Sequence, residues 1–266
     1  MRAGGTVCGG KRSSMIVIPA IDIKDGKCVR LVEGRESTAT VFEGDPADWA
    51  LRWVREGAKY LHVVDLDGAF HGAPRNLPKV KEIVERAGVP VEFGGGVRDS
   101  EVVMTLAGVG VARIILGSQV VDRFEWAEKM FRALPGRIAV GIDAVKGCVA
   151  VHGWTKMTNI DAFALARKCQ RAGAAAVIYT DITRDGKMAG ANLEAMCVMA
   201  ESVTMPVIAS GGVTTVEDLT NLKAAGCHGA IIGRALYDGK ITLKAAIEAA
   251  AEKPAGQEGP ESNASG

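Results

Sequence analysis

The sequence predicts an α/β fold, a closed (β/α)8 TIM barrel built of two repeated half-barrels. Two observations lead to this prediction. β-branched runs alternate with helix-like segments along the chain, and a Gly-rich stretch occurs twice. Residues 89–121 and 205–237 align without gaps at an offset of 116 positions, which pairs Gly95 with Gly211. Each half of the chain therefore carries one copy of the same Gly-rich element.

The β-branched runs are apolar rather than alternating, which is typical of parallel strands covered on both faces. We expect strands in residues 15–22, 60–67, 90–95, 112–118, 137–144, 175–182, 206–212 and 229–235. We expect helices in residues 46–57, 76–87, 99–109, 123–133, 159–172, 192–203, 215–225 and 241–252. The first helix shows the start and stop signals clearly, with Asp45 as N-cap, Pro46 in the first turn and Gly57 past the end.

Strands that alternate with helices indicate a parallel sheet, for which an open doubly wound sheet and a closed barrel are the alternatives. The count of eight strand–helix units favours the barrel. The repeat decides between them, because residues 55–67 also align with residues 171–183 at the same offset. Four strand–helix units in each half are better explained by two half-barrels than by an open sheet.

Composition is typical of a cytosolic globular protein and gives no sign of a nucleic-acid or membrane protein. The formal net charge is +1, and no apolar run approaches the roughly 20 residues of a membrane helix. The six cysteines form no CxxC pair, which is typical of reduced thiols in the cytoplasm. We expect one folded domain over residues 15–253, a disordered leader over 1–14 and a disordered tail over 254–266.

Chemistry in a (β/α)8 barrel is located at the carboxyl ends of the strands. In both halves, Gly-rich turns follow the third and fourth strands, and such turns bind phosphate through their free backbone N–H groups. We therefore expect a ligand with a phosphate at each end. The predicted phosphate-binding residues are Gly95, Gly96, Gly117, Ser118, Gly190, Gly211, Gly212, Gly233 and Arg234. The alternative is that these glycines only form tight turns.

Between the two predicted phosphate sites, Asp22 and Asp143 end the first and fifth strands, which face each other across an eight-stranded ring. Each follows an isoleucine and precedes a Gly-containing turn and a Val-rich segment that we expect to form a hairpin. Opposed carboxylates are suited to general acid–base chemistry when their surroundings separate their pKa values.

The chain resembles the ProFAR isomerase family of histidine biosynthesis. The resemblance covers residues 15–250 and is carried by the segments "IPAIDIKDGKCVRL", "LHVVDLDGA", "GGGVRD", "GIDAVKGCVAVHGW", "TDITRDG" and "ASGGV". It implies a barrel of two half-barrels, a substrate with two phosphates, and an Amadori rearrangement of an aminoaldose to an aminoketose. It also implies that no metal and no organic cofactor take part.

The resemblance implies roles for individual residues. Asp22 matches the family's general base and Asp143 its general acid, and Thr180 matches a residue that supports the acid. Trp154 matches an aromatic of a mobile loop that stacks on the substrate. Arg30 is expected to meet the substrate from the first loop, although a surface salt bridge is the alternative.

Asp185 matches a substrate-contacting loop position, with a plain Asp-Gly turn as the alternative. Lys187 follows this turn where the family usually has Thr, a departure that touches loop contacts but not the catalytic pair. His62 is interpreted as a hydrogen-bonded histidine of the core. The other histidines lack metal-ligand spacing, so we predict no metal site.

Other functions stay open at this point. The related cyclase typically opens with Cys-Leu-Asp where this chain has "AID". A bifunctional isomerase that also acts on phosphoribosylanthranilate typically has Arg where this chain has His152. A barrel that binds bisphosphates without turnover would not need Asp22 and Asp143, and a Schiff-base aldolase would need a lysine at a strand end. We expect a monomer with a small-molecule bisphosphate substrate, no nucleic-acid partner and no membrane partner.

Overall fold

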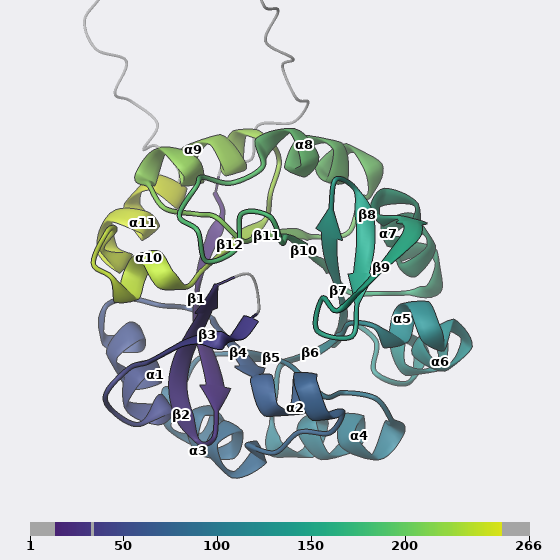
Figure 1. Ribbon diagram of the computed structural model, residues 1–266, viewed down its shortest axis with the longest axis horizontal. Helices are drawn as coiled ribbons and strands as arrows, with labels where there is room; N and C mark the ends of the chain where they lie inside the picture. Colours follow the sequence, from purple (N-terminus) through teal and green to yellow (C-terminus); the bar gives the residue numbers. More distant parts are fainter. Residues whose placement is uncertain (1–13, 33–34, 252–266) are drawn as a thin grey trace, which may run out of the picture.

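A computed structural model describes residues 14–32 and 35–251. The predicted leader and tail lie almost entirely outside the described residues, so their prediction is untested. Within the described part, the chain forms the predicted barrel of parallel strands surrounded by helices (Figure 1).

The barrel is closed by parallel pairing between β7 and β10, so its strand order runs β10–β11–β12–β1–β4–β5–β6–β7 and returns to β10. Its strands are β1 (Ile16–Lys24), β4 (Leu61–Asp65), β5 (Val91–Gly94), β6 (Arg113–Leu116), β7 (Ile138–Val145), β10 (Val177–Asp181), β11 (Val207–Ser210) and β12 (Gly229–Ile232). Successive strands of the barrel are also successive along the chain, except where β12 pairs with β1 and closes the circle between the two ends of the domain. The closed barrel was predicted correctly; the half-barrel repeat stays a prediction.

Helices pack on the outside of the barrel (Figure 1). They are α1 (Pro46–Arg55), α2 (Leu66–His71), α3 (Leu77–Ala87), α4 (Ser100–Val109), α5 (Gln119–Asp122), α6 (Phe124–Ala133), α7 (Ala162–Ala172), α8 (Leu193–Ser202), α9 (Val216–Ala224), α10 (Arg234–Tyr237) and α11 (Leu243–Ala250). The larger core cluster fills the space between strands and helices, and includes Trp53, Phe93 and Phe131. This shell fixes the strand positions from which the site residues project.

The helix ends follow local side-chain chemistry. Asp45 accepts a hydrogen bond from Ala47 N, Asp99 from Val102 N and Asn192 from Ala195 N, as expected of N-caps. The short helices α2, α5 and α10 were not predicted, because helices of four to six residues are too short to show an apolar period. They begin directly after β4, Ser118 and Gly233, at the carboxyl end of the barrel.

Two antiparallel hairpins extend the barrel beyond the first and fifth strands. β1 continues into β2 (Lys27–Val32) and β3 (Arg35–Val41), and β7 continues into β8 (Cys148–Val151) and β9 (Lys156–Asp161). The turns contain Asp25 and Lys146 with φ of 49° and 51°, each followed by a glycine with positive φ. This pair of positive φ values is the geometry of a type I′ hairpin turn. The hairpins expected after Asp22 and Asp143 are therefore present.

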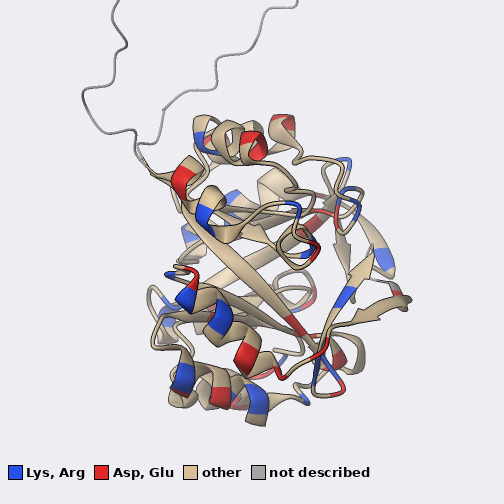
Figure 2. Cartoon of the chain, turned by 90° about the vertical axis from the view of Figure 1, so that its left-hand side faces the viewer, with Lys and Arg blue, Asp and Glu red and all other residues tan. Residues whose placement is uncertain are grey.

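Charge is mixed over the surface. On the side shown in Figure 2, basic and acidic residues are interspersed along the helices, in agreement with the formal net charge of +1. Among the described residues, no helix is both long enough and apolar enough to cross a membrane.

Candidate active site

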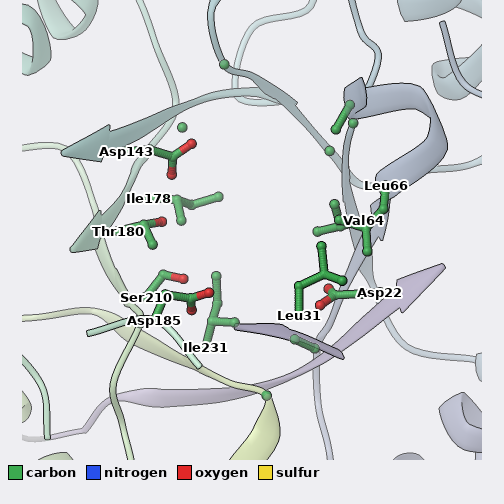
Figure 3. A pocket seen from close by; sticks show the side chains of 18 of the residues that line it. Asp22, Leu31, Val64, Leu66, Asp143, Ile178, Thr180, Asp185, Ser210 and Ile231 are labelled. Atoms are coloured by element: carbon green, nitrogen blue, oxygen red, sulfur yellow. The ribbon is translucent and has the colours of Figure 1, made fainter. Parts of the chain in front are cut away.

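A cavity of about 310 Å³ opens at the carboxyl ends of the barrel strands. Every residue predicted for the site lines this cavity except Gly190. Figure 3 shows Asp22 on one side of the cavity and Asp143 and Thr180 on the opposite side, with Asp185 on the side of Thr180 and Ser210. The chain thus brings three carboxylates from distant segments into one space.

Asp22 is paired with a buried arginine. Arg30, on β2, forms an ion pair with the Asp22 carboxylate, and its guanidinium also donates to the carbonyl of Ala20. The guanidinium lies 4.6 Å from the ring centroid of Tyr237, whose hydroxyl donates to the same carbonyl at 3.1 Å. Arg30 is only 6% exposed, so the alternative of a surface salt bridge is wrong. The hairpin turn after β1 places Arg30 there by folding β2 back on Asp22.

Asp143 occupies a different environment. Burial raises the pKa of Asp143, and hydrogen bonds from the side chains of Trp154 and Thr180 partly oppose this shift. Thr180 is the register partner of Asp143 on the neighbouring strand β10. Trp154 reaches the same carboxyl from the loop between β8 and β9, where its φ is 69°. Asp143 therefore retains a proton more readily than an exposed aspartate does.

Asp185 is the third carboxyl group of the cavity. Burial, followed by the nearby negative charge of Asp22, raises the pKa of Asp185 to about 7. It follows β10 in a loop whose next residue, Gly186, has a φ of 68°. A Cβ atom at Gly186 would lie 2.7 Å from the Leu31 carbonyl oxygen. The loop with Asp185 therefore packs directly against β2, which also carries Arg30.

Close backbone approaches explain the paired glycines. A Cβ atom at Gly95 would lie 2.1 Å from the carbonyl oxygen of Asp65, and one at Gly211 would lie 3.0 Å from that of Asp181. A Cβ atom at Gly212 would lie 2.4 Å from the carbonyl oxygen of Gly190. Gly95, Gly211 and Gly212 have positive φ, so tight turns alone already require glycine. Gly190 supports the turn at Gly212 but does not line the cavity.

Asp65 holds the turn against which Gly95 packs. This carboxylate is fully buried. It accepts hydrogen bonds from the backbone N–H groups of Gly68, Arg75 and Asn76 and from the Asn76 side chain, at 2.6–2.8 Å. The loop after β4 is therefore rigid where it supports the first Gly-rich turn.

The other two predicted phosphate turns each carry a polar partner. Ser118 Oγ accepts a hydrogen bond from His152 N at 2.7 Å, which joins the turn after β6 to the loop of Trp154. Arg234 donates to the Gly186 carbonyl at 2.9 Å and to Asp238 at 3.0 Å. A Cβ atom at Gly233 would lie 3.2 Å from Arg30 Nε. That Nε atom is buried without a hydrogen-bond partner.

Several lining residues were not predicted as site residues. Arg98 follows the first Gly-rich turn directly, and this position next to the glycines was the signal that could have found it. His62 was interpreted as a hydrogen-bonded core residue; it is hydrogen-bonded, to Glu92, but it also lines the cavity. Strand alternation could have indicated this, because His62 and Val64 project from the same face of β4.

A barrel with carboxylates at its strand ends and Gly-rich turns around them has the architecture of a (β/α)8-barrel enzyme. The chain belongs to the family described as Histidine biosynthesis protein, whose sequence profile matches residues 16–242.

Curated relatives of this chain are 1-(5-phosphoribosyl)-5-((5-phosphoribosylamino)methylideneamino)imidazole-4-carboxamide isomerases. The protein of Geobacter sulfurreducens is 49% identical over 236 residues, which cover 88% of this chain and 97% of the relative. The protein of Acetivibrio thermocellus is 47% identical, covering 89% of this chain and 100% of the relative. The protein of Thioalkalivibrio sulfidiphilus is 49% identical, and the match covers 86% of this chain and 96% of the relative. The resemblance found in the sequence motifs is confirmed.

Proposed function

We propose that this protein acts on the substrate for which its relatives are named, and converts this aminoaldose, ProFAR, to the corresponding aminoketose PRFAR. The observation that carries the proposal is the placement of Asp22 and Asp143 on opposite sides of one cavity, with Gly-rich turns on its rim. The near-complete coverage of relatives with this activity supports it further.

The two phosphates of ProFAR bind at opposite sides of the barrel. One is held by the backbone N–H groups after β5 and β6, with Ser118 as a side-chain donor, and the other by those after β11 and β12, with Arg234. Both sets of turns line the cavity, and free N–H groups at such turns favour anions. Two fixed anion sites orient the ribose between the carboxylates.

Asp143 acts as the general acid and Asp22 as the general base. Asp143 gives its proton to the ribose ring oxygen, the C1′–O bond breaks, and C1′ forms an iminium with the attached nitrogen. Asp22 then removes the C2′ proton, and the electron pair of that C–H bond forms an enolamine. Return of a proton to C1′ and loss of the C2′ hydroxyl proton yield the ketose. The raised pKa of Asp143 and the ion pair of Asp22 with Arg30 support this division.

Trp154 stacks on the substrate when its loop closes, and Asp185 and Arg30 contact the sugar between the phosphates. No residue in this scheme requires a metal or an organic cofactor. We also propose a monomeric, cytoplasmic enzyme without nucleic-acid or membrane partners. The described cysteines are free thiols, which supports a reducing compartment.

Turnover of ProFAR by the purified, metal-free protein tests the proposal, beside Asp22→Asn and Asp143→Asn. Both variants should lose activity by at least about a hundredfold, because each removes one proton-transfer group. Asp48→Asn is the matched control, because Asp48 lies exposed on α1 and pairs with Arg86. Phosphoribosylanthranilate is tested as a second substrate and should not be converted. Tight binding of ProFAR without turnover would leave a barrel that only binds bisphosphates.

A further inference from the structure

A charged network extends from His62, which lines the cavity, to Glu92 and Arg113 inside the barrel. Glu92, on β5, is fully buried and lies between His62 on β4 and Arg113 on β6. His62 Nδ1 is 2.7 Å from Glu92 Oε1, and Arg113 Nη1 is 2.9 Å from Glu92 Oε2. The three residues are register partners on neighbouring strands. They therefore form one continuous row inside the barrel.

The charged side chains of this network contrast with the apolar side chains around them inside the barrel. Apart from the polar groups of the cavity, the barrel interior is an apolar cluster that contains Ile18, Ile115, Ile178, Ile208 and Ile231. A buried ion pair contributes little net stability compared with apolar residues of similar volume, because desolvation of both charges opposes their attraction. The network is therefore better explained by orientation of a group than by stability.

The group that it orients is the His62 imidazole. Arginine has only donors, and the Glu92 carboxylate has only acceptors, so Arg113 holds one carboxylate oxygen and leaves the other for His62. His62 must then carry a proton on Nδ1 to bond with Glu92. In the neutral imidazole, Nε2 is left as an acceptor, and His62 lines the cavity.

Resting on the function proposed above, we propose that Glu92 and Arg113 are positioning residues that hold His62 so that Nε2 accepts a hydrogen bond from a sugar hydroxyl of the substrate. Hydroxyl groups are the donors that a phosphosugar offers between its phosphates. The phosphates and the facing carboxylates of Asp22, Asp143 and Asp185 are acceptors or acids with roles of their own. A fixed acceptor on the β4 wall adds an orienting contact that these groups do not supply.

Glu92→Gln should reverse the donor pattern of the network. The single carbonyl oxygen of the glutamine amide pairs with Arg113, which can only donate, and the amide NH2 then faces His62 Nδ1. Nδ1 must become an acceptor, so the imidazole proton moves to Nε2. The atom that faces the substrate hydroxyl changes from acceptor to donor without a change in shape.

Nitrogen-15 NMR of the histidine side chains measures this directly, with the His62 signals assigned from a His62→Gln variant. In the neutral imidazole, we expect the proton of His62 on Nδ1 in the native protein and on Nε2 in Glu92→Gln. His228 is an internal control. Its Nδ1 accepts a hydrogen bond from Val207 N at 3.2 Å, and it belongs to a distant part of the sequence, so Glu92→Gln should leave its signals unchanged. A native His62 with its proton on Nε2 would overturn the inference.

Enzyme kinetics show whether the network orients His62 toward the substrate or only stabilises the fold. Glu92→Gln should lower kcat/KM for ProFAR about tenfold or more, the cost of about one hydrogen bond to the substrate. Glu128→Gln removes a carboxylate from an exposed pair with Arg132 on α6 and should leave kcat/KM unchanged. If Glu92→Gln lowers only the thermal midpoint, while the position of the His62 proton and kcat/KM stay the same, the network serves only the stability of the fold.

ProFAR added to the inactive Asp143→Asn variant tests the contact itself. The His62 Nε2 signal should move when ProFAR binds. An unchanged signal, with normal turnover by the native protein, would refute the contact and leave the isomerase function standing. Absence of turnover by the native protein would refute the function, while the position of the His62 proton would still be measured in the free protein.

Discussion

Replacing Asp185 by asparagine should make the protein more stable at alkaline pH and should reduce its activity. The Asp185 carboxyl faces a cavity that already contains Asp22 and Asp143, and burial raises its pKa to about 7. The folded protein therefore loses free energy of unfolding whenever this carboxyl is ionised. Asparagine has nearly the same shape and no charge to lose.

The magnitude follows from the two pKa values. The difference between the ordinary value of 3.8 and about 7 is roughly 3 units, and each unit corresponds to about 1.4 kcal/mol. Because the folded state holds the proton more tightly, the destabilisation is absent below pH 3.8, grows as the pH rises, and is complete above about pH 7. The full penalty is about 4 kcal/mol, and near pH 5 it is about 2 kcal/mol.

Urea unfolding of the native protein and Asp185→Asn, at about pH 5 and about pH 8, measures this penalty. The variant should gain stability at both pH values, and its advantage should grow by about 2 kcal/mol between them. Comparison of the two proteins at each pH cancels the titration of all other groups. The expected cost is activity, since Asp185 lines the cavity in which we propose that the substrate binds.

An advantage that is equal at both pH values would refute the reasoning, because it would show that Asp185 does not titrate in this window. A variant that is less stable at alkaline pH would refute it more strongly. That result would mean that the carboxylate is stabilised in the folded state by Arg30, rather than penalised by burial and by Asp22.

Three further predictions concern the framework of the site. Gly95→Ala should lower the free energy of unfolding in urea by at least about 2 kcal/mol, because the new Cβ would overlap the Asp65 carbonyl. Gly136 also has a positive φ but open space around it, so Gly136→Ala should lower that free energy by only about 1 kcal/mol. Equal losses in the two variants would contradict this prediction. Asp65→Asn should lower the free energy of unfolding by about 3 kcal/mol, because a buried carboxylate that accepts four hydrogen bonds is replaced by an amide whose NH2 finds no acceptor. A loss below about 1 kcal/mol would argue against a rigid loop after β4. Burial raises the pKa of Cys169 to about 12, so this thiol should react far more slowly with a disulfide reagent at about pH 8 than the partly exposed Cys197, and mapping of the labelled peptides decides.

Much of the fold could be predicted from local patterns. The alternation of apolar runs and helix-like segments located the barrel strands and the longer helices of the described residues, because each signal spans enough residues to show its period. Single-turn helices such as α5 and α10 were missed for the opposite reason. Caps at Asp45 and Asp99 were predictable, since a capping side chain bonds to a backbone two or three residues away.

The site was predictable only where it lies at the ends of strands. Asp22, Asp143 and Thr180 were located because barrel topology brings strand ends together. The environment of each carboxyl group could not be predicted, because its burial and its partners depend on segments far apart in the chain. Arg30 was expected at the substrate, but its burial against Asp22 and Tyr237 required the packing of β2 on α10.

By itself, the sequence determined the family, the closed barrel and the candidate acid–base pair, because strand periodicity, turn glycines and motif residues are written in consecutive positions. The tertiary structure alone decided which carboxyl is ion-paired and which have raised pKa values, and that His62 joins Glu92 and Arg113 across three strands. The physical reason is that charge and hydrogen bonding act through space over a few ångströms, and only the closed barrel brings those groups within that range.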